Sequence, residues 1–135
     1  QLAICPAERT ILHQRIARRF ERMMAEGFLE EVRGLWQRPD LHAALPAIRA
    51  VGYRQLWQHL EGECSLEQAV KNAEAATRQL ARRQLTWLRK WRNLAWIYTD
   101  QAGKRAFEGS SSVREEGAGE TPLTLALKYL ESTPL

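Results

Sequence analysis

Cysteine, proline and glycine are all scarce in this sequence of 135 residues. It holds 2 cysteines, 5 prolines and 8 glycines. Two cysteines without a CxxC pair cannot form a disulfide framework, so we expect Cys5 and Cys64 to be reduced thiols. The modest glycine and proline counts exclude collagen-like and low-complexity proteins. Reduced thiols are typical of a cytoplasmic protein, which is what we expect. No apolar run approaches ~18 residues and no signal-peptide pattern is present, so we expect no membrane partner.

The composition is that of a globular chain with a moderate positive charge. Hydrophobic residues make up 44% and charged residues 27%, with 20 Lys and Arg against 16 Asp and Glu. This length suits one domain and is enough to bury a core. The formal net charge of +4 permits an anionic partner but does not demand one.

Hydrophobic periodicity predicts a mainly α-helical chain with one or two short strands. Apolar residues at three- and four-residue spacing predict helices between Pro6 and Gly27, over 28–36, over 53–60, and from 66 to 91 or 92. Short apolar runs predict strands at 2–5 and 95–98, and residues 39–52 have the composition of a loop.

Two short strands make a poor sheet by themselves, because their backbone groups need hydrogen-bond partners. We therefore expect this chain to be the C-terminal part of a longer α/β protein; the alternative is a helical domain with an extended leader. Residues 101–122 are rich in Gly, Ser and Glu and predict a flexible linker. Residues 123–135 predict a short terminal helix or a disordered tail.

The predicted helix that begins at 66 ends in a strongly basic stretch. Residues 78–92 carry six cations and no acid. A helical wheel places Leu80, Trp87 and Trp91 on one face, which we expect to pack inward. It places four arginines on the opposite face as a ridge, with Arg83 and Lys90 on its flank: Arg78, Arg82, Arg89 and Arg92. Such a ridge is typical either of a solvated surface or of a surface that binds phosphate groups.

A glycine between two arginines, in 49–55 (RAVGYRQ), is the second informative feature. Gly52 directly before a predicted helix allows a ligand backbone to approach closely, and the helix amides can face a phosphate. Tyr53 has a ring that can stack on a base. The alternative is an ordinary loop with a turn that tolerates glycine.

Four segments together resemble one protein family. They are 12–20 (LHQRIARRF), 49–55 (RAVGYRQ), 76–84 (ATRQLARRQ) and 86–89 (TWLR). In this order and spacing they are similar to the C-terminal part of the tRNA dimethylallyltransferases, also called tRNA isopentenyltransferases. The resemblance runs from about residue 2 to about residue 98, and the tail from Gln101 onward does not share it.

The resemblance implies an enzyme that modifies tRNA. Members transfer a dimethylallyl group from dimethylallyl diphosphate to N6 of adenine 37, beside the tRNA anticodon. Their catalytic domain has a P-loop-type α/β fold related to nucleotide-binding proteins. The phosphate loop, the Mg²⁺ site and the aspartate base belong to the family's N-terminal third, which this sequence does not match. We therefore expect an active, monomeric full-length enzyme, of which this fragment alone is inactive.

The resemblance also implies roles for individual residues within 1–100, as the C-terminal part of the catalytic and tRNA-binding domain. Arg19 matches an arginine that holds the diphosphate. Two stretches match contacts to the tRNA anticodon stem-loop: Arg49, Ala50, Val51, Gly52, Tyr53 and Arg54, and then Arg83, Gln84, Thr86, Trp87, Arg89 and Lys90. The wheel adds Arg78 and Arg82 as phosphate contacts. The alternatives are a non-catalytic RNA-binding helical module and a helical domain whose arginines pair with carboxylates of a partner protein.

Overall fold

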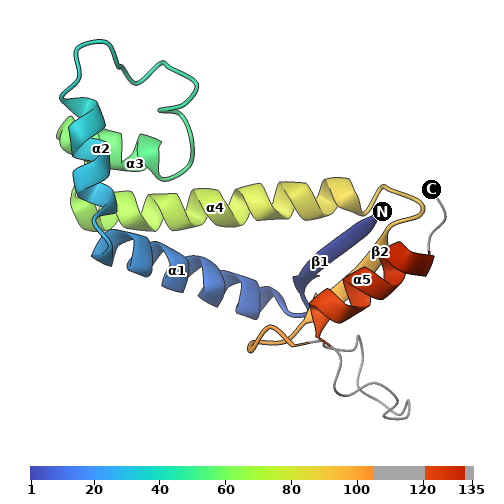
Figure 1. Ribbon diagram of the computed structural model, residues 1–135. Helices are drawn as coiled ribbons and strands as arrows, with labels where there is room; N and C mark the ends of the chain where they lie inside the picture. Colours follow the sequence, from blue (N-terminus) through green and yellow to red (C-terminus); the bar gives the residue numbers. More distant parts are fainter. Residues whose placement is uncertain (105–120, 133–135) are drawn as a thin grey trace. The chain divides into compact units, whose positions relative to one another are not determined.

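A computed structural model describes residues 1–104 and 121–132, and these residues are mainly helical (Figure 1). This confirms the predicted fold class of helices with short strands. The chain forms two compact units, which we call the helical unit (Gln14–Gln84) and the sheet unit (Gln1–His13 with Leu85–Leu135). The elements in order are β1 (Leu2–Pro6), α1 (Arg9–Ala25), α2 (Phe28–Trp36), α3 (Tyr53–Leu60), α4 (Leu66–Leu88), β2 (Ala95–Thr99) and α5 (Pro122–Ser132).

The core of the helical unit draws side chains from four helices and one loop. The buried members are Phe20 of α1, Phe28 and Val32 of α2, Leu56 and Trp57 of α3, Ala69 and Ala73 of α4, and Ile48 of the connecting loop. Phe28 and Val32, like Ala69 and Ala73, are four residues apart, so α2 and α4 each present one apolar stripe to the core. Gly27 has a φ of 96°, a left-handed conformation that glycine adopts readily, and it lets α1 turn directly into α2.

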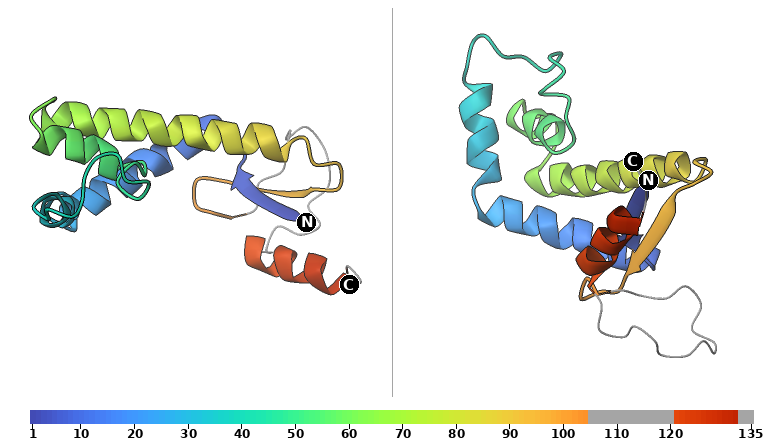
Figure 2. Two further views of the ribbon diagram at one scale, coloured as in Figure 1. Left: turned by 90° about the horizontal axis from the view of Figure 1, so that it is seen from above. Right: turned by 45° about the vertical axis from the view of Figure 1, so that its right-hand side comes forward.

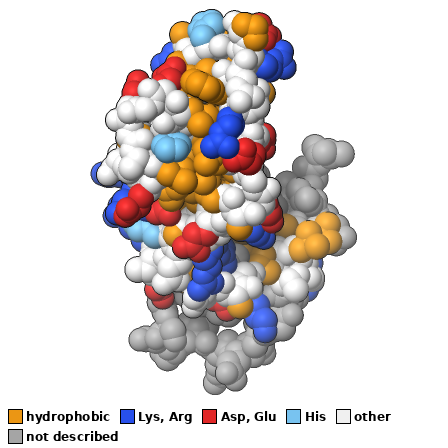
Figure 3. Space-filling model, turned by 90° about the vertical axis from the view of Figure 1, so that its left-hand side faces the viewer, with side chains coloured by type: hydrophobic (Ala, Val, Ile, Leu, Met, Phe, Trp, Pro, Cys, Tyr) orange, Lys and Arg blue, Asp and Glu red, His pale blue; other side chains and the backbone are white. Residues whose placement is uncertain are grey.

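The segment between α2 and α3 is irregular, as predicted for residues 39–52. Successive turns stabilise it, with Leu45 N–H donating to His42 O (3.1 Å) and Arg49 N–H donating to Leu45 O (3.1 Å). Ile48 is buried and ties this loop to the core. At the end of the unit that carries α2, α3 and the loop, partly buried apolar side chains reach the surface (Figure 3).

The sheet unit holds a parallel pair of strands. β1 and β2 lie side by side in both views of Figure 2, with Ile4 opposite Ile97 in the register. Ala95 N–H donates to Gln1 O (3.0 Å) at one end, and Ala7 N–H donates to Thr99 O (2.9 Å) at the other. α5 packs against β2. None of the helices described here is long and apolar enough to cross a membrane.

α5 falls within the segment for which a short terminal helix or a tail was predicted. Its first turn is capped by Thr121, whose Oγ1 accepts a hydrogen bond from Thr124 N–H (3.2 Å). Residues 105–120, which make up most of the predicted linker, lie outside the described residues.

α4 is shorter than predicted. It ends at Leu88 rather than at 91 or 92, because residues 89–94 turn the chain toward β2. The backbone hydrogen bonds just after the helix span three residues instead of four: Lys90 N–H donates to Trp87 O, and Trp91 N–H donates to Leu88 O. Arg89 therefore directly follows the helix and Arg92 lies beyond it, so of the predicted four-arginine ridge only Arg78 and Arg82 stand on α4.

The prediction that Leu80, Trp87 and Trp91 pack inward is wrong. All three are exposed, and Trp87 most of all, at 59%. The buried positions of α4, Ala69 and Ala73, lie in its first half, where the core is. A helical wheel identifies an apolar face but does not tell how far along the helix its neighbours reach.

Candidate nucleic-acid interface

The loop that precedes α3 presents its cationic side chains to solvent. Arg49, Ala50 and Arg54 are exposed, Val51 and Tyr53 are half-buried. The backbone is closed by a hydrogen bond from Arg54 N–H to Ala50 O (3.1 Å). The loop is therefore a defined turn with an arginine on each side.

Gly52 is required by the packing of the protein itself. It is buried, with a φ of 97°, and a Cβ built there would lie 3.2 Å from Cε1 and Cζ of Phe28 and 3.7 Å from Cε2 of Phe20. The space beside this glycine is thus filled by Phe28, whereas the sequence suggested that a ligand backbone would approach there. No L-residue fits this conformation without strain.

Gln55 holds the start of α3 in place. Its side-chain Oε1 accepts a hydrogen bond from Gly52 N–H (2.9 Å), and the residue is buried. This is the half of a capping box that the third helical residue supplies. Sequence reasoning missed Gln55, although a glutamine three residues after a helix-capping glycine is a recognisable signal.

Tyr53 is tied to α2 by both its ring and its hydroxyl. The ring meets Phe28 edge to face, with centroids 5.1 Å apart, and the hydroxyl donates to Glu31 Oε1. The hydrogen bond to Glu31, together with burial and the carboxylate charge, raises the pKa of Tyr53. Tyr53 therefore anchors the loop on α2, and base stacking by this ring remains a prediction.

The cations of the helical unit divide into two classes. Several pair with a carboxylate close in sequence: Arg22 with Glu26 (3.7 Å), Arg33 with Glu30 (2.6 Å), Arg38 with Asp40 (2.7 Å), Lys71 with Glu67 (2.5 Å) and Arg78 with Glu74 (3.4 Å). The Arg38 hydrogen bond holds the pKa of Asp40 below its usual value. Within residues 1–104 and 121–132, by contrast, no ion pair engages Arg49 or Arg54.

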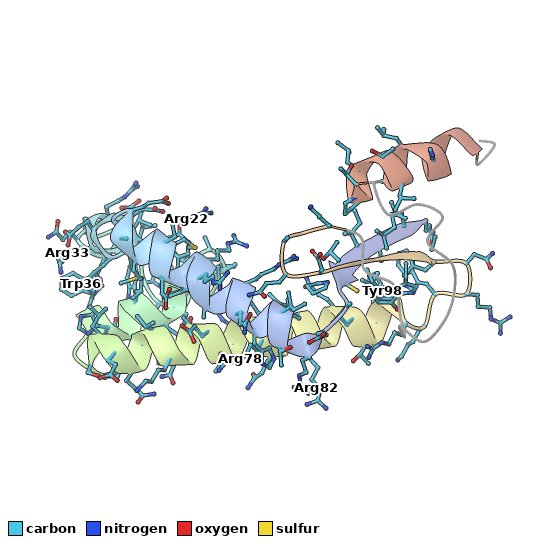
Figure 4. The ribbon with its side chains drawn as sticks, turned by 90° about the horizontal axis from the view of Figure 1, so that it is seen from below. Arg22, Arg33, Trp36, Arg78, Arg82 and Tyr98 are labelled. Atoms are coloured by element: carbon cyan, nitrogen blue, oxygen red, sulfur yellow. The ribbon has the colours of Figure 1, made fainter. Side chains whose placement is uncertain are left out.

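The second half of α4 carries further predicted contacts. Arg82, Arg83 and Gln84 are exposed, and Arg82 extends away from the helix in Figure 4. Arg78 was predicted to point outward as part of the ridge. Its guanidinium is instead partly covered and lies near Glu74 of the preceding turn. Its charge is therefore partly neutralised within the protein.

The remaining predicted contacts belong to the sheet unit. Thr86, Trp87, Arg89 and Lys90 are all exposed around the end of α4. Trp87 meets Trp91 edge to face, with ring centroids 4.9 Å apart. In the part of the chain that the structure describes, neither Arg89 nor Lys90 forms an ion pair with a carboxylate. The stretch combines exposed cations with an exposed aromatic ring.

Arg19 lies on α1 within the helical unit. It is exposed, and no carboxylate of the described residues pairs with it. The next residue in sequence, Phe20, lies beside Gly52 together with Phe28. Arg19 is therefore adjacent in sequence to a residue that packs against the loop. No group of three or more His, Cys, Asp or Glu among the described residues could hold a metal ion. The Mg²⁺ ion implied by the resemblance remains an expectation.

Comparisons with known proteins agree on one family. The family model described as "IPP transferase" matches residues 1–91. The crystal structure of the full-length tRNA isopentenylpyrophosphate transferase from Bacillus halodurans is similar, with 33% identity, a TM-score of 0.64, and coverage of 74% of this chain and 31% of that one. A tRNA delta(2)-isopentenylpyrophosphate transferase from Staphylococcus epidermidis gives 30% identity, a TM-score of 0.63 and coverage of 75% and 31%. The chain thus spans about a third of the length of these solved structures.

Proposed function

The chain belongs to the IPP transferase family, and on this premise we propose that it supplies the tRNA-binding part of a tRNA prenyltransferase. Its substrates are tRNA, bound at the anticodon stem-loop, and dimethylallyl diphosphate. Because tRNA is the substrate, we place the protein in the cytoplasm. The observation that carries the proposal is the loop 49–54, whose arginines lie on a hydrogen-bonded turn and have no ion pair among the described residues.

The proposed reaction is an alkyl transfer to the exocyclic amine of adenine 37. The N6 nitrogen forms a bond to C1 of the dimethylallyl group, while the bond from C1 to the diphosphate oxygen breaks. The diphosphate leaves with the electron pair, and N6 loses a proton to a base outside this chain. Arg19 stabilises the negative charge that grows on the leaving diphosphate, because a guanidinium matches phosphate oxygens in a fork geometry.

The contrast between paired and unpaired arginines supports tRNA binding at the loop. A guanidinium that already pairs with a carboxylate loses part of its attraction for phosphate, whereas Arg49 and Arg54 keep theirs. The backbone around them is held by the hydrogen bond from Gly52 to Gln55, so two phosphate contacts can form with little loss of backbone freedom. The loop therefore presents two unpaired cations on a fixed backbone, an arrangement suited to binding a polyanion.

The test compares a double variant of the loop with a paired arginine elsewhere in the same unit. Arg49→Ala with Arg54→Ala should weaken binding of an anticodon stem-loop RNA by about tenfold or more at low salt. It should also reduce the slope of log affinity against log salt by about 2, because two phosphate contacts are lost. Arg38→Ala is the control and should change both quantities little, since Arg38 pairs with Asp40. Fluorescence anisotropy over a salt series measures both.

Two results would contradict parts of this proposal. If the double variant and Arg38→Ala weaken RNA binding equally, the loop is not the binding site. If the wild-type chain binds no RNA detectably, a partner protein with carboxylates is favoured instead. A non-catalytic RNA-binding module would bind in the same way. It is distinguished by replacing the matching segment of the Bacillus halodurans enzyme with this chain, and by measuring transfer of labelled dimethylallyl groups to tRNA.

A further inference from the structure

Two side chains on one face of α2 hold two successive residues of the loop 49–54. Phe28 fills the space beside Gly52, and its ring also meets the ring of Tyr53 edge to face. Glu31 follows Phe28 by three residues and accepts a hydrogen bond from the Tyr53 hydroxyl. Because residues three apart on a helix share a face, α2 contacts the loop through one surface that combines an apolar ring with a carboxylate.

Glu31 is an exposed carboxylate whose side chain is engaged by Tyr53. Its backbone N–H donates to Gly27 O (3.1 Å), which fixes the residue in the first turn of α2. Among the residues that the structure describes, no Lys or Arg forms an ion pair with Glu31. Its neighbour Glu30, by contrast, pairs with Arg33 (2.6 Å). The two adjacent acids of this turn therefore have different partners.

By its charge alone, a carboxylate at this place opposes RNA binding. Arg49 and Arg54 are the proposed phosphate contacts of the loop, and a negative charge bonded to Tyr53 repels the same phosphates. A role in holding the loop offsets this cost. Tyr53 directly precedes Arg54, so fixing the Tyr53 side chain restricts the backbone from which Arg54 projects, and less freedom is lost when RNA binds.

We propose that Glu31 is a positioning residue for RNA binding: through the Tyr53 hydroxyl it fixes the loop 49–54, so that Arg49 and Arg54 are placed for phosphate contacts before RNA binds. The inference rests on the proposed function of this loop. It predicts an effect opposite in sign to that of simple electrostatics, because loss of an acidic side chain should weaken the binding of a polyanion.

The test measures the affinity of the full 135-residue chain for an anticodon stem-loop RNA by fluorescence anisotropy. Glu31→Ala should weaken binding about two- to tenfold, which corresponds to one net hydrogen bond. Glu31→Gln keeps an acceptor oxygen for the Tyr53 hydroxyl and removes the charge, so it should bind at least as tightly as the wild type. Glu30→Ala is the matched control: it removes the adjacent carboxylate, which pairs with Arg33, and should not weaken binding.

Two further readouts separate positioning from a direct contact with RNA. The slope of log affinity against log salt should be the same for Glu31→Ala as for the wild type, because both arginines of the loop remain. Glu31→Ala combined with Tyr53→Phe should bind no more weakly than the weaker of the two single variants, since both changes remove the same interaction.

The failure of this inference is distinguishable from the failure of the proposed function. Undetectable RNA binding by the wild-type chain, or no effect of Arg49→Ala with Arg54→Ala, would overturn both. If the arginines of the loop do bind RNA, unchanged or tighter binding by Glu31→Ala would overturn the role of Glu31 alone. Additive losses in the combined Glu31 and Tyr53 variant, or an equal loss with Glu31→Gln, would do the same.

Discussion

The helical unit and the sheet unit differ in how completely they bury their apolar residues. In the helical unit, eight buried residues from four helices and a loop form one core. In the sheet unit, Ala3, Ile97 and Ala126 are buried, but Ile4, Trp87 and Trp91 are exposed. The two predicted RNA-contacting segments are therefore held in place to different extents. The loop 49–54 is held by the core, and the stretch 86–90 lies among uncovered aromatic residues.

The largest effect that would sharpen this comparison is expected in the core. Leu56 of α3 is 0% exposed, so Leu56→Ala should lower the free energy of unfolding by about 3–5 kcal/mol through lost burial and a cavity. The corresponding truncation in the sheet unit, Ile4→Ala, should cost less than about 1 kcal/mol, because Ile4 is more than half exposed. Urea unfolding followed by circular dichroism measures both. Similar costs would show that the units do not differ in packing as described.

A smaller effect tests the backbone conformation and the packing at Gly52. Gly52→Ala should cost about 2–4 kcal/mol, from a positive φ and from a Cβ 3.2 Å from Phe28. Gly27→Ala is a control for a positive φ without a close neighbour: its φ is 96° and its ψ of 22° is in the left-handed helical region, and nothing lies within 4 Å of the added Cβ. It should cost about 1–2 kcal/mol, the strain alone.

The difference between these two glycine variants measures the contact with Phe28 together with the greater backbone strain at Gly52, whose ψ of −61° lies outside the left-handed helical region. If both variants lose the same stability in thermal or urea unfolding, the close approach of Phe28 does not determine the residue at 52. The helical unit would then not hold the loop by packing against it.

The smallest expected effect concerns Tyr53. Tyr53→Phe removes the hydrogen bond to Glu31 but keeps the ring against Phe28, so it should cost about 0.5–1.5 kcal/mol at neutral pH. The pKa of Tyr53 is raised above its ordinary value of 10.0 in the folded state. The stabilisation that the Tyr53 hydroxyl gives to the folded state is therefore fully present below about pH 10. It is lost as the pH rises through the pKa of Tyr53 in the folded protein.

The pH dependence of unfolding distinguishes this contribution from a general effect of alkali. The wild-type protein should lose more stability than Tyr53→Phe between neutral pH and alkaline pH above 10, so that the two curves converge. Parallel curves would show that the hydroxyl does not contribute through Glu31.

The local elements and the family could be read from the sequence because they depend on short-range patterns. The spacing of apolar residues predicted α1, α2 and α3, and Gly27 was recognised as the end of α1. Short apolar runs predicted both strands. The segments 49–55 and 76–84 indicated a family that the comparison over residues 1–91 then matched. The exact end of α4 was missed, since the turn toward β2 sets it.

Tertiary structure decided what each of these residues touches. The wheel placed Trp87 and Trp91 on an apolar face, yet burial needs a neighbour at that point along the helix, and none of the described residues supplies it. Gly52 was recognised as special, but only the fold showed that Phe28 of another helix fills the space beside it. Periodicity is a property of the chain near a residue, whereas burial and edge exposure depend on segments distant in sequence. Short-range patterns therefore set which elements form, and the packing between these elements sets which side chains remain available for a partner.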